Sequence, residues 1–159
     1  MSEKRDTLPQ GWEWKKLGDI VDILDSKRKP ISQKDRIVGE YPYYGASGIL
    51  DYINNYIFDE KLLLIGEDGA KWEANENTSF IAIGKYWVNN HAHVLKPKRE
   101  IVLDEYLVYH LNHSDLSRYI TGATVKKLNQ AKLREIDIPL PPLEEQRRIV
   151  GVLDGLFSY

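Results

Sequence analysis

The sequence predicts an α+β fold, in which a β-rich body with a few helices is followed by a C-terminal helix that leaves the body. Three observations support this class. Short apolar segments separated by glycine, asparagine and aspartate recur between Trp12 and Pro97, which is typical of a curved sheet or partial barrel. After Asp104 the apolar period becomes helical. A proline-rich segment, 139–142, then precedes a helix with one apolar face.

The composition is that of an ordinary globular protein. Of its 159 residues 42% are hydrophobic, 29% are charged, and the net charge is −2. There is no cysteine, which excludes disulfides, thiolate metal sites and a cysteine nucleophile. No apolar run approaches the ~20 residues of a membrane span, and the polar residues 1–6 do not resemble a signal peptide. We therefore expect a cytoplasmic protein without a membrane segment.

The β-rich body is expected to begin with one strand over residues 12–24, whose apolar period is mixed. Residues 41–57 are expected to form a strand, a tight turn at 45–48 and a second strand. The continuous apolar run 62–66 is typical of a strand buried on both faces. Further strands are expected at residues 80–83, 86–88, 89–95 and 135–138.

Helices are expected where the period changes. Asp104 is a suitable N-cap for an amphipathic helix that continues through Leu111. Ser114 is expected to start a further short turn, which Gly122 ends. Asn129 is expected to cap one more short helix.

The prolines near the C-terminus predict a stiff hinge. Pro139, Pro141 and Pro142 lack the N–H that a strand ladder or helix interior requires. Pro142 suits the first position of a helix, where that N–H has no partner. We therefore expect a division into a body, 1–138, and a hinge with its helix, 139–159.

The terminal helix carries an apolar stripe that allows two interpretations. It can pack on the core of its own body, or it can contact a partner, and the hinge favours the partner. Glycines at 151 and 155 cost ~1 kcal/mol each relative to alanine, which close approach of another helix would explain. The residues expected to contact a partner are Gln146, Ile149, Val150, Gly151, Leu153 and Leu156.

Basic residues gather in two segments that have the composition of loops. Lys27, Arg28 and Lys29 are consecutive, and Lys126 and Lys127 belong to a stretch without acidic residues. A charge cluster is usually only a solvated face, and the net charge argues against binding nucleic acid through bulk charge. Two clusters beside glycine-containing turns nevertheless indicate a surface that faces phosphate groups.

No set of residues makes a convincing catalytic site. Glu67 and Asp68 are adjacent, so a strand would point them to opposite faces, and Asp68 followed by glycine is typical of a turn. His91 and His93 share a strand face and could bind a metal, but further ligands are not evident. Ser47 lacks the surroundings of a nucleophile elbow. We expect a binding module without metal or cofactor; a metal bound at the two histidines would instead favour a small hydrolase.

Several motifs, in order along nearly the whole chain, resemble one family. Each motif alone is weak, but the ordered set resembles the specificity subunits of type I restriction–modification enzymes. The motifs are LPQGWEWKKLGD at 8–19, YPYYGASGI at 41–49, LIGEDG at 64–69, GATVKKLN at 122–129 and PLPPLEEQ at 139–146.

The resemblance implies a non-catalytic module that reads one half of a bipartite site in double-stranded DNA. It implies a single target-recognition domain followed by the start of a long coiled-coil helix that docks methyltransferase subunits and, in the full enzyme, a restriction subunit. S-adenosylmethionine would be bound by the methyltransferase and not by this chain. Because a full subunit has two recognition domains, the chain is expected to be a half-subunit that pairs with a second domain, by homodimerisation for instance, or a fragment ending at Tyr159.

Candidate DNA contacts follow from this resemblance and from the side-chain types. An alternative class remains open, in which the chain is a non-DNA interaction or decoy module that occupies methyltransferase subunits through its helix. For Tyr86 the alternative is packing in the core. The expected phosphate contacts are Lys27, Arg28, Lys29, Lys126 and Lys127, and the expected base or sugar contacts are Ser47, Lys71, Lys85, Tyr86 and Asn89.

Overall fold

Three sheets form the body of the protein. The computed structural model describes residues 6–157. The central sheet has the order β2–β9–β6–β7 and a second sheet the order β4–β3–β8–β5, while β1 and β10 form a separate pair. The strands are β1 (Glu13–Lys16), β2 (Val21–Ile23), β3 (Val38–Gly45), β4 (Gly48–Ile53), β5 (Phe58–Asp59), β6 (Leu62–Gly66), β7 (Ser79–Ala82), β8 (Lys85–Val88), β9 (Ala92–Pro97) and β10 (Asp137–Leu140).

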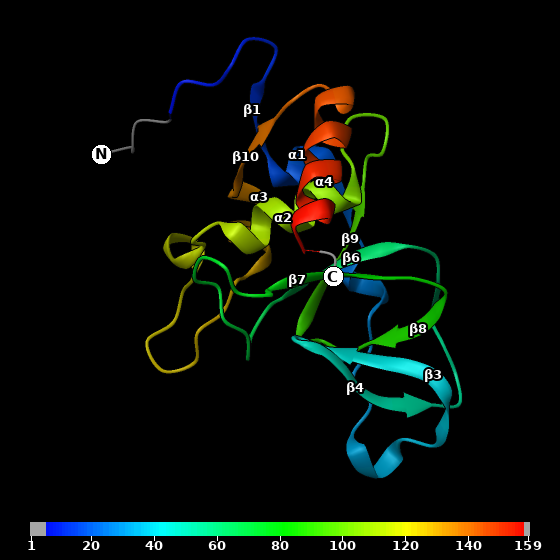
Figure 1. Cartoon of the computed structure of the whole chain (residues 1–159). Helices are drawn as coiled ribbons and strands as arrows, with labels where there is room; N and C mark the ends of the chain where they lie inside the picture. Colours follow the sequence, from blue (N-terminus) through cyan, green and yellow to red (C-terminus); the bar gives the residue numbers. More distant parts are fainter. Residues whose placement is uncertain (1–5, 158–159) are drawn as a thin grey trace.

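The helices gather beside the central sheet, whereas β3 and β4 lie at the opposite end of the molecule (Figure 1). This mixed architecture confirms the predicted α+β class. No helix among the described residues is both long and apolar enough to cross a membrane. The helices are α1 (Leu17–Ile20), α2 (Asp104–His113), α3 (Gln130–Glu135) and α4 (Leu143–Phe157), with 3-10 turns at Asp25–Lys27, Gln33–Asp35 and Ser117–Tyr119.

Strand β6 separates two hydrophobic cores. All of its residues are buried, which confirms the prediction for 62–66. Successive side chains of a strand point to opposite faces, so Leu63 and Ile65 join the core formed with the helices. Leu62 and Leu64 join the core shared with the second sheet. The central sheet is therefore covered on both sides.

The N-terminal prediction of one strand over 12–24 was wrong. The chain forms β1, a helical turn α1 and then β2, which belongs to a different sheet. Leu17 and Ile20 are both fully buried, three residues apart, on the face that packs against α3. The mixed period of this segment therefore reflects a helical turn between two short strands.

The hinge begins later than the prolines predict. Pro139 lies within β10, paired with Trp14 of β1, although it was expected to end the ladder. A sheet of two strands has only edges, and an edge strand tolerates a residue without an N–H. The expected division at 138/139 thus falls inside β10, and the chain turns at Pro141 and Pro142 instead. Helix α4 follows from Leu143, and Ser158 and Tyr159 of the expected helix lie outside the described residues.

The predicted helix caps had different outcomes. Asn129 caps α3 as expected, because its side chain accepts a hydrogen bond from the Lys132 N–H at 2.9 Å. Asp104 was expected as the N-cap of α2, but the cap position is occupied by Leu103. The carboxylate of Asp104 is buried and accepts two hydrogen bonds from Arg99, both at 3.0 Å. Asp104 therefore anchors the helix start through an ion pair.

Candidate nucleic-acid interface

Several loops meet where β6 ends and the antiparallel β9 begins. Glu67 accepts a backbone hydrogen bond from Leu128 at 2.7 Å and donates one to His91 at 2.8 Å. The Lys29 N–H donates to the carbonyl of Val88 at 3.0 Å. These bonds join segments that are distant in the sequence. We call this region the loop end, and it comprises residues 25–29, 45–48, 67–72, 89–91 and 121–128.

Gly66 allows the loops to pack closely at the end of β6. A Cβ atom at this position would lie 2.4 Å from the Cβ of Ala70 and 3.4 Å from the carbonyl oxygen of Ala46. Real Cβ atoms do not approach so closely, so any side chain would push the loops apart. The indole N–H of Trp72 also donates to the Gly66 carbonyl at 3.0 Å. The β3–β4 turn and the 67–72 loop are consequently held together, and the tight turn predicted at 45–48 is confirmed.

A buried network of charged side chains lies beneath these loops. Arg28 contacts Glu67 at 3.0 Å and Asp25 at 3.8 Å. His93 is fully buried, with Nδ1 2.6 Å from Asp25 and 3.5 Å from Glu67. We call Asp25, Arg28, Glu67 and His93 the charged quartet. Its acids and bases lie in direct contact, so each buried charge has an opposite partner.

Hydrogen-bond partners surround both His93 and Asp25 in this network. Nδ1 of His93 faces Asp25 and Nε2 faces the carbonyl of Leu128 at 2.5 Å, so both ring nitrogens meet acceptors. Burial alone would raise the pKa of Asp25, but the hydrogen bond and charge of His93, the Val94 N–H and Arg28 together hold it below 3.8. Asp25 therefore stays ionised inside the protein.

The geometry does not favour the metal site considered for His91 and His93. Ligand atoms of Asp25, Glu67 and His93 do lie within 4.8 Å of one another. However, the Arg28 guanidinium already contacts both carboxylates, and His93 has a protein acceptor on each nitrogen. His91 instead pairs with Asp68 at the surface. The cluster is therefore arranged as an internal ion-pair network.

Exposed lysines surround this network. Lys27 and Lys29 flank Arg28, and Lys71 follows the residues packed on Gly66. Lys126 is exposed, and Lys127 lies 3.7 Å from Asp68 with half of its side chain accessible. Within residues 6–157, no ion pair joins the other four lysines to an acid. The structure thus brings together cations from segments that are far apart in the sequence.

Some expected DNA contacts are contradicted by burial. Tyr86 is fully buried, and its hydroxyl donates to the Glu60 carbonyl at 2.8 Å, so the alternative of core packing is correct. Asn89 is 3% exposed, and its side chain accepts from the His91 N–H. Neither side chain is available to DNA, because each fills a position in the body. The side chain of Arg28 is only 16% exposed and serves the charged quartet.

The remaining candidates differ in position. Ser47 is exposed at the β3–β4 turn, within the loop end. Lys85 is exposed at the start of β8, the opposite end of that strand from Asn89, with its ammonium 5.1 Å from the ring centre of Tyr56. Lys85 therefore lies apart from the other candidates. The sequence interpretation also missed Asp25 and Glu67. Their only signal was their position, because Asp25 precedes the basic segment 27–29 and Glu67 lies in the turn motif 64–69.

Helix α4 is docked on the body mainly along its first turns. Farther along the helix, the hydroxyl of Tyr109 on α2 donates to the carboxylate of Asp154. Gln146 was expected to contact a partner, but it is fully buried. Its Oε1 accepts from the Leu103 N–H, and its Nε2 donates to the carbonyls of Ile101 and Pro141, all at 2.9 Å. Ile149 and Val150 are partly buried and pack against the core. These three side chains hold the helix on its own body, as the other interpretation of the stripe predicts.

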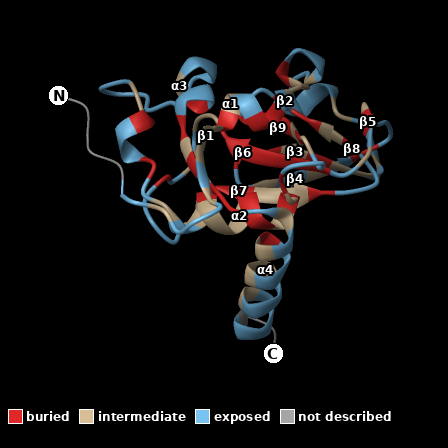
Figure 2. Ribbon diagram, turned by 90° about the horizontal axis from the view of Figure 1, so that it is seen from above, coloured by how far each residue is buried: buried red, intermediate tan, exposed pale blue. Residues whose placement is uncertain are grey.

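The distal part of α4 leaves the body (Figure 2). Val152 and Leu156 are 54% and 59% exposed, and Leu153 is half-buried. A Cβ atom added at Gly151 or Gly155 would meet nothing within 4 Å. This part of the helix therefore presents apolar side chains and accessible backbone to its surroundings.

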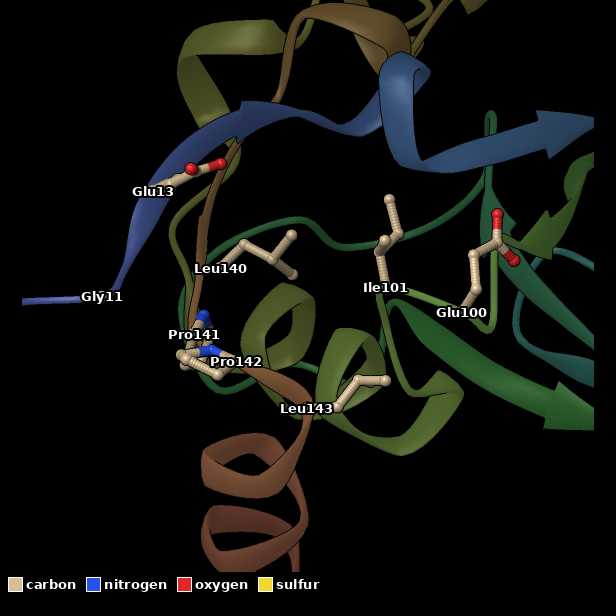
Figure 3. Close-up of a pocket in the computed structure, with 8 residues that line it drawn as sticks. All are labelled: Gly11, Glu13, Glu100, Ile101, Leu140, Pro141, Pro142 and Leu143. Carbon is tan, nitrogen blue, oxygen red and sulfur yellow. The ribbon is translucent and has the colours of Figure 1, made fainter.

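A hollow of about 330 Å³ lies at the joint between the body and α4 (Figure 3). Its walls are mainly apolar side chains, with two glutamates among its lining residues. It is open to solvent beside the turn at Pro141 and Pro142. The lining residues are Gly11, Glu13, Glu100, Ile101, Leu140, Pro141, Pro142 and Leu143.

A β-rich body with a basic loop end and a half-docked helix is the architecture of a binding module. Comparison with known families defines this module. Residues 9–158 match the family described as the type I restriction modification DNA specificity domain, so the chain belongs to that family. The resemblance carried by the sequence motifs is thereby confirmed.

Curated relatives are named as specificity subunits. A putative type I restriction enzyme specificity subunit of Haemophilus influenzae is 38% identical over 144 residues, which are 91% of this chain and 37% of the relative. The MjaVIII specificity subunit of Methanocaldococcus jannaschii is 28% identical over 153 residues, 92% of this chain and 36% of the relative. The chain thus spans less than two fifths of either protein, and the prediction of a non-catalytic specificity component is confirmed at the family level.

Solved structures have the same fold. The HsdS subunit from Thermoanaerobacter tengcongensis matches with a TM-score of 0.65 and 25% identity, over 94% of this chain and 38% of that subunit. A chain from a structure of a type I restriction–modification system matches with a TM-score of 0.73 and 24% identity, over 95% of this chain and 39% of that one. The chain therefore corresponds to a single domain of these larger subunits.

Proposed function

We propose that the chain reads one half of a bipartite DNA site for a type I restriction–modification system. The observation that carries the proposal is the loop end, where exposed lysines from distant segments lie on loops that the charged quartet joins. Phosphate contacts fix the position of a protein on DNA, and contacts to base edges supply sequence specificity. Exposed cations on structured loops are suited to provide both.

The candidate residues divide between these two kinds of contact. Lys27, Lys29, Lys126 and Lys127 are proposed to contact phosphates, because their ammonium groups are exposed on long side chains. Ser47 and Lys71 are proposed to contact bases or sugars. Hydroxyl and ammonium groups can donate to base acceptors in the major groove.

Helix α4 is proposed to dock methyltransferase subunits, which would supply the S-adenosylmethionine and the catalysis. The exposed Val152 and Leu156 and the accessible backbone at Gly151 support this role. The restriction subunit would bind to the complex that this chain forms with the methyltransferase subunits. The chain is proposed to work with a second recognition domain; if a second copy provides it through an isologous two-fold interface, the recognised sequence consists of inverted half-sites.

Methylome sequencing tests this function. A host that carries the gene with its methyltransferase is compared with a host in which this chain is deleted. The proposal predicts a bipartite methylation motif that disappears with the deletion. An unchanged methylome would contradict it, and a methyltransferase bound but left inactive by the chain would identify a decoy.

A further inference from the structure

The charged quartet connects nearly every segment that reaches the loop end. Asp25 and Arg28 come from the first loop, Glu67 follows β6, and His93 lies in β9. The quartet also contacts segment 121–130, because the Leu128 carbonyl faces His93 and the Gln130 amide donates to Asp25 at 3.3 Å. Arg28 further donates to the carbonyls of Asn90 and Ala92, at 3.3 and 2.9 Å. One network thus touches four of these segments.

Apolar side chains could fill this space at lower cost. Removing charges from water is expensive, and well-packed hydrophobic residues are often as stabilising as a buried ion pair. Hydrogen bonds between charged groups differ from apolar contacts because they are directional and fix orientation as well as distance. A network of this kind therefore holds loops in one arrangement, which apolar packing does less strictly.

The exposed candidates adjoin the members of this network in sequence. Lys27 and Lys29 flank Arg28, while Glu67 precedes Asp68, whose carboxylate contacts both His91 and Lys127. A shift of Arg28 or Glu67 would move these side chains relative to one another. Reading a base pair depends on such placement, whereas attraction to phosphate depends mainly on charge.

We propose that the charged quartet is a positioning device, which sets the base discrimination of the loop end without itself contacting DNA. The inference rests on the proposed function. It predicts that breaking the quartet lowers sequence discrimination while affinity for DNA of unrelated sequence is retained. Loss of a surface lysine should have the opposite effect.

Glu67→Gln tests the device, because the amide keeps the shape of the side chain and removes its charge. The variant is assembled with its methyltransferase and titrated with three fluorescent duplexes: one with the methylome motif, one with a single base pair changed, and one scrambled. We expect preference for the motif over the changed duplex to fall about tenfold, and affinity for the scrambled duplex to change less than about twofold.

Asp104→Asn is the matched control. It breaks the ion pair between the buried carboxylate of Asp104 and Arg99. Arg99 follows the last residue of β9, whereas His93 lies near the first residue of that strand. We expect it to lower the melting temperature comparably and to leave discrimination unchanged. A second control, Lys126→Gln, should weaken all three duplexes equally and reduce the slope of log affinity against log salt by about one.

Gln130→Ala is a milder variant, which tests the same inference if Glu67→Gln does not fold. It removes one bond to Asp25 from an exposed residue, and discrimination should fall in the same direction by a smaller factor. Unchanged discrimination in the folded variants overturns the inference, as does an equal loss in Asp104→Asn. If the wild-type complex itself shows no discrimination, the proposed function fails and this inference fails with it.

Discussion

The loop end and the joint of α4 are held in place by different interactions. Charged side chains in direct contact hold the loops, with Arg28 and His93 facing Asp25 and Glu67. The joint of α4 is held by apolar packing and by the three hydrogen bonds of one neutral amide, Gln146. Directional bonds between charged groups hold irregular loops in one arrangement. Helix α4, whose backbone is regular, is held chiefly at its start, with one further hydrogen bond from Tyr109 to Asp154.

The largest change in stability is expected from a substitution at the start of α4. Gln146→Leu leaves the Leu103 N–H and the carbonyls of Ile101 and Pro141 without their partner in a buried position. Because each unsatisfied group costs ~1–3 kcal/mol, we expect the free energy of unfolding to fall by about 3 kcal/mol. Urea denaturation measures this change. Glu144→Gln, at an exposed position of the same helix, should have almost no effect, and a loss below ~1 kcal/mol in Gln146→Leu would contradict the anchoring role.

Acid should affect helix α2 and the loop end in different pH ranges. Burial lowers the pKa of His110 on α2 from 6.5 to about 4, although a backbone hydrogen bond at Asp137 partly opposes the shift. The unfolded chain therefore takes up this proton at higher pH than the folded protein, and stability is lost as pH falls from 6.5 to about 4. We expect a contribution of about 2 kcal/mol, because the side chain is only partly buried.

His110→Gln should remove this part of the pH dependence, which urea denaturation between pH 7 and 4 would detect. His113→Gln, on an exposed residue of the same helix, is the comparison variant. The charge of His113 contributes least to lowering the pKa of His110, so most of the pH dependence should remain in this variant. The pKa of Asp25 is lowered, so its contribution is present above 3.8 and is lost only as pH falls through its lower folded value. A wild-type curve that is flat between pH 6.5 and 4 would rule out the His110 contribution.

A smaller effect on folding should accompany changes in the distal part of α4. Val152→Ser with Leu156→Ser replaces apolar side chains that are already more than half exposed. We expect less than ~0.5 kcal/mol change in the free energy of unfolding, and about tenfold weaker binding to the methyltransferase if these residues lie at the centre of its interface. Calorimetric titration measures the binding. Equal affinity would place the partner surface elsewhere.

The smallest change is expected from one surface lysine. Lys27→Gln removes an exposed cation that forms no ion pair within the described part of the chain. Stability should be unchanged, and the slope of log affinity against log salt should decrease by about one, equally for motif and scrambled duplexes. Fluorescence anisotropy at several salt concentrations measures the slope. An unaltered slope would remove Lys27 from the phosphate contacts.

Local sequence signals predicted the elements that depend on neighbouring residues. The apolar run of β6, the glycine turn at 45–48 and the Asn129 cap are all present. Features that depend on distant residues were missed. Leu17 and Ile20 adopt a helical turn because α3 covers them, and Gln146 is buried because its amide binds Ile101 and Leu103 of a remote segment.

The candidate site was predictable to a similar extent. The basic segments at 27–29 and 126–127 were evident from the sequence, and the fold brings them to one end of the central sheet. The inward direction of Tyr86 was not evident, because a tyrosine can either fill a core or face DNA. Nor could the sequence indicate that Asp25 and Glu67 would meet Arg28 and His93, because such contacts depend on the pairing of β6 with β9.

This chain is proposed to confer DNA sequence specificity on the methyltransferase that it assembles with. The most direct measurement is the affinity of the assembled complex for a duplex with the methylome motif and for a scrambled duplex of the same composition, at one salt concentration. We predict that the motif is bound about 10³-fold more tightly or better. Equal affinity for the two duplexes would contradict the account.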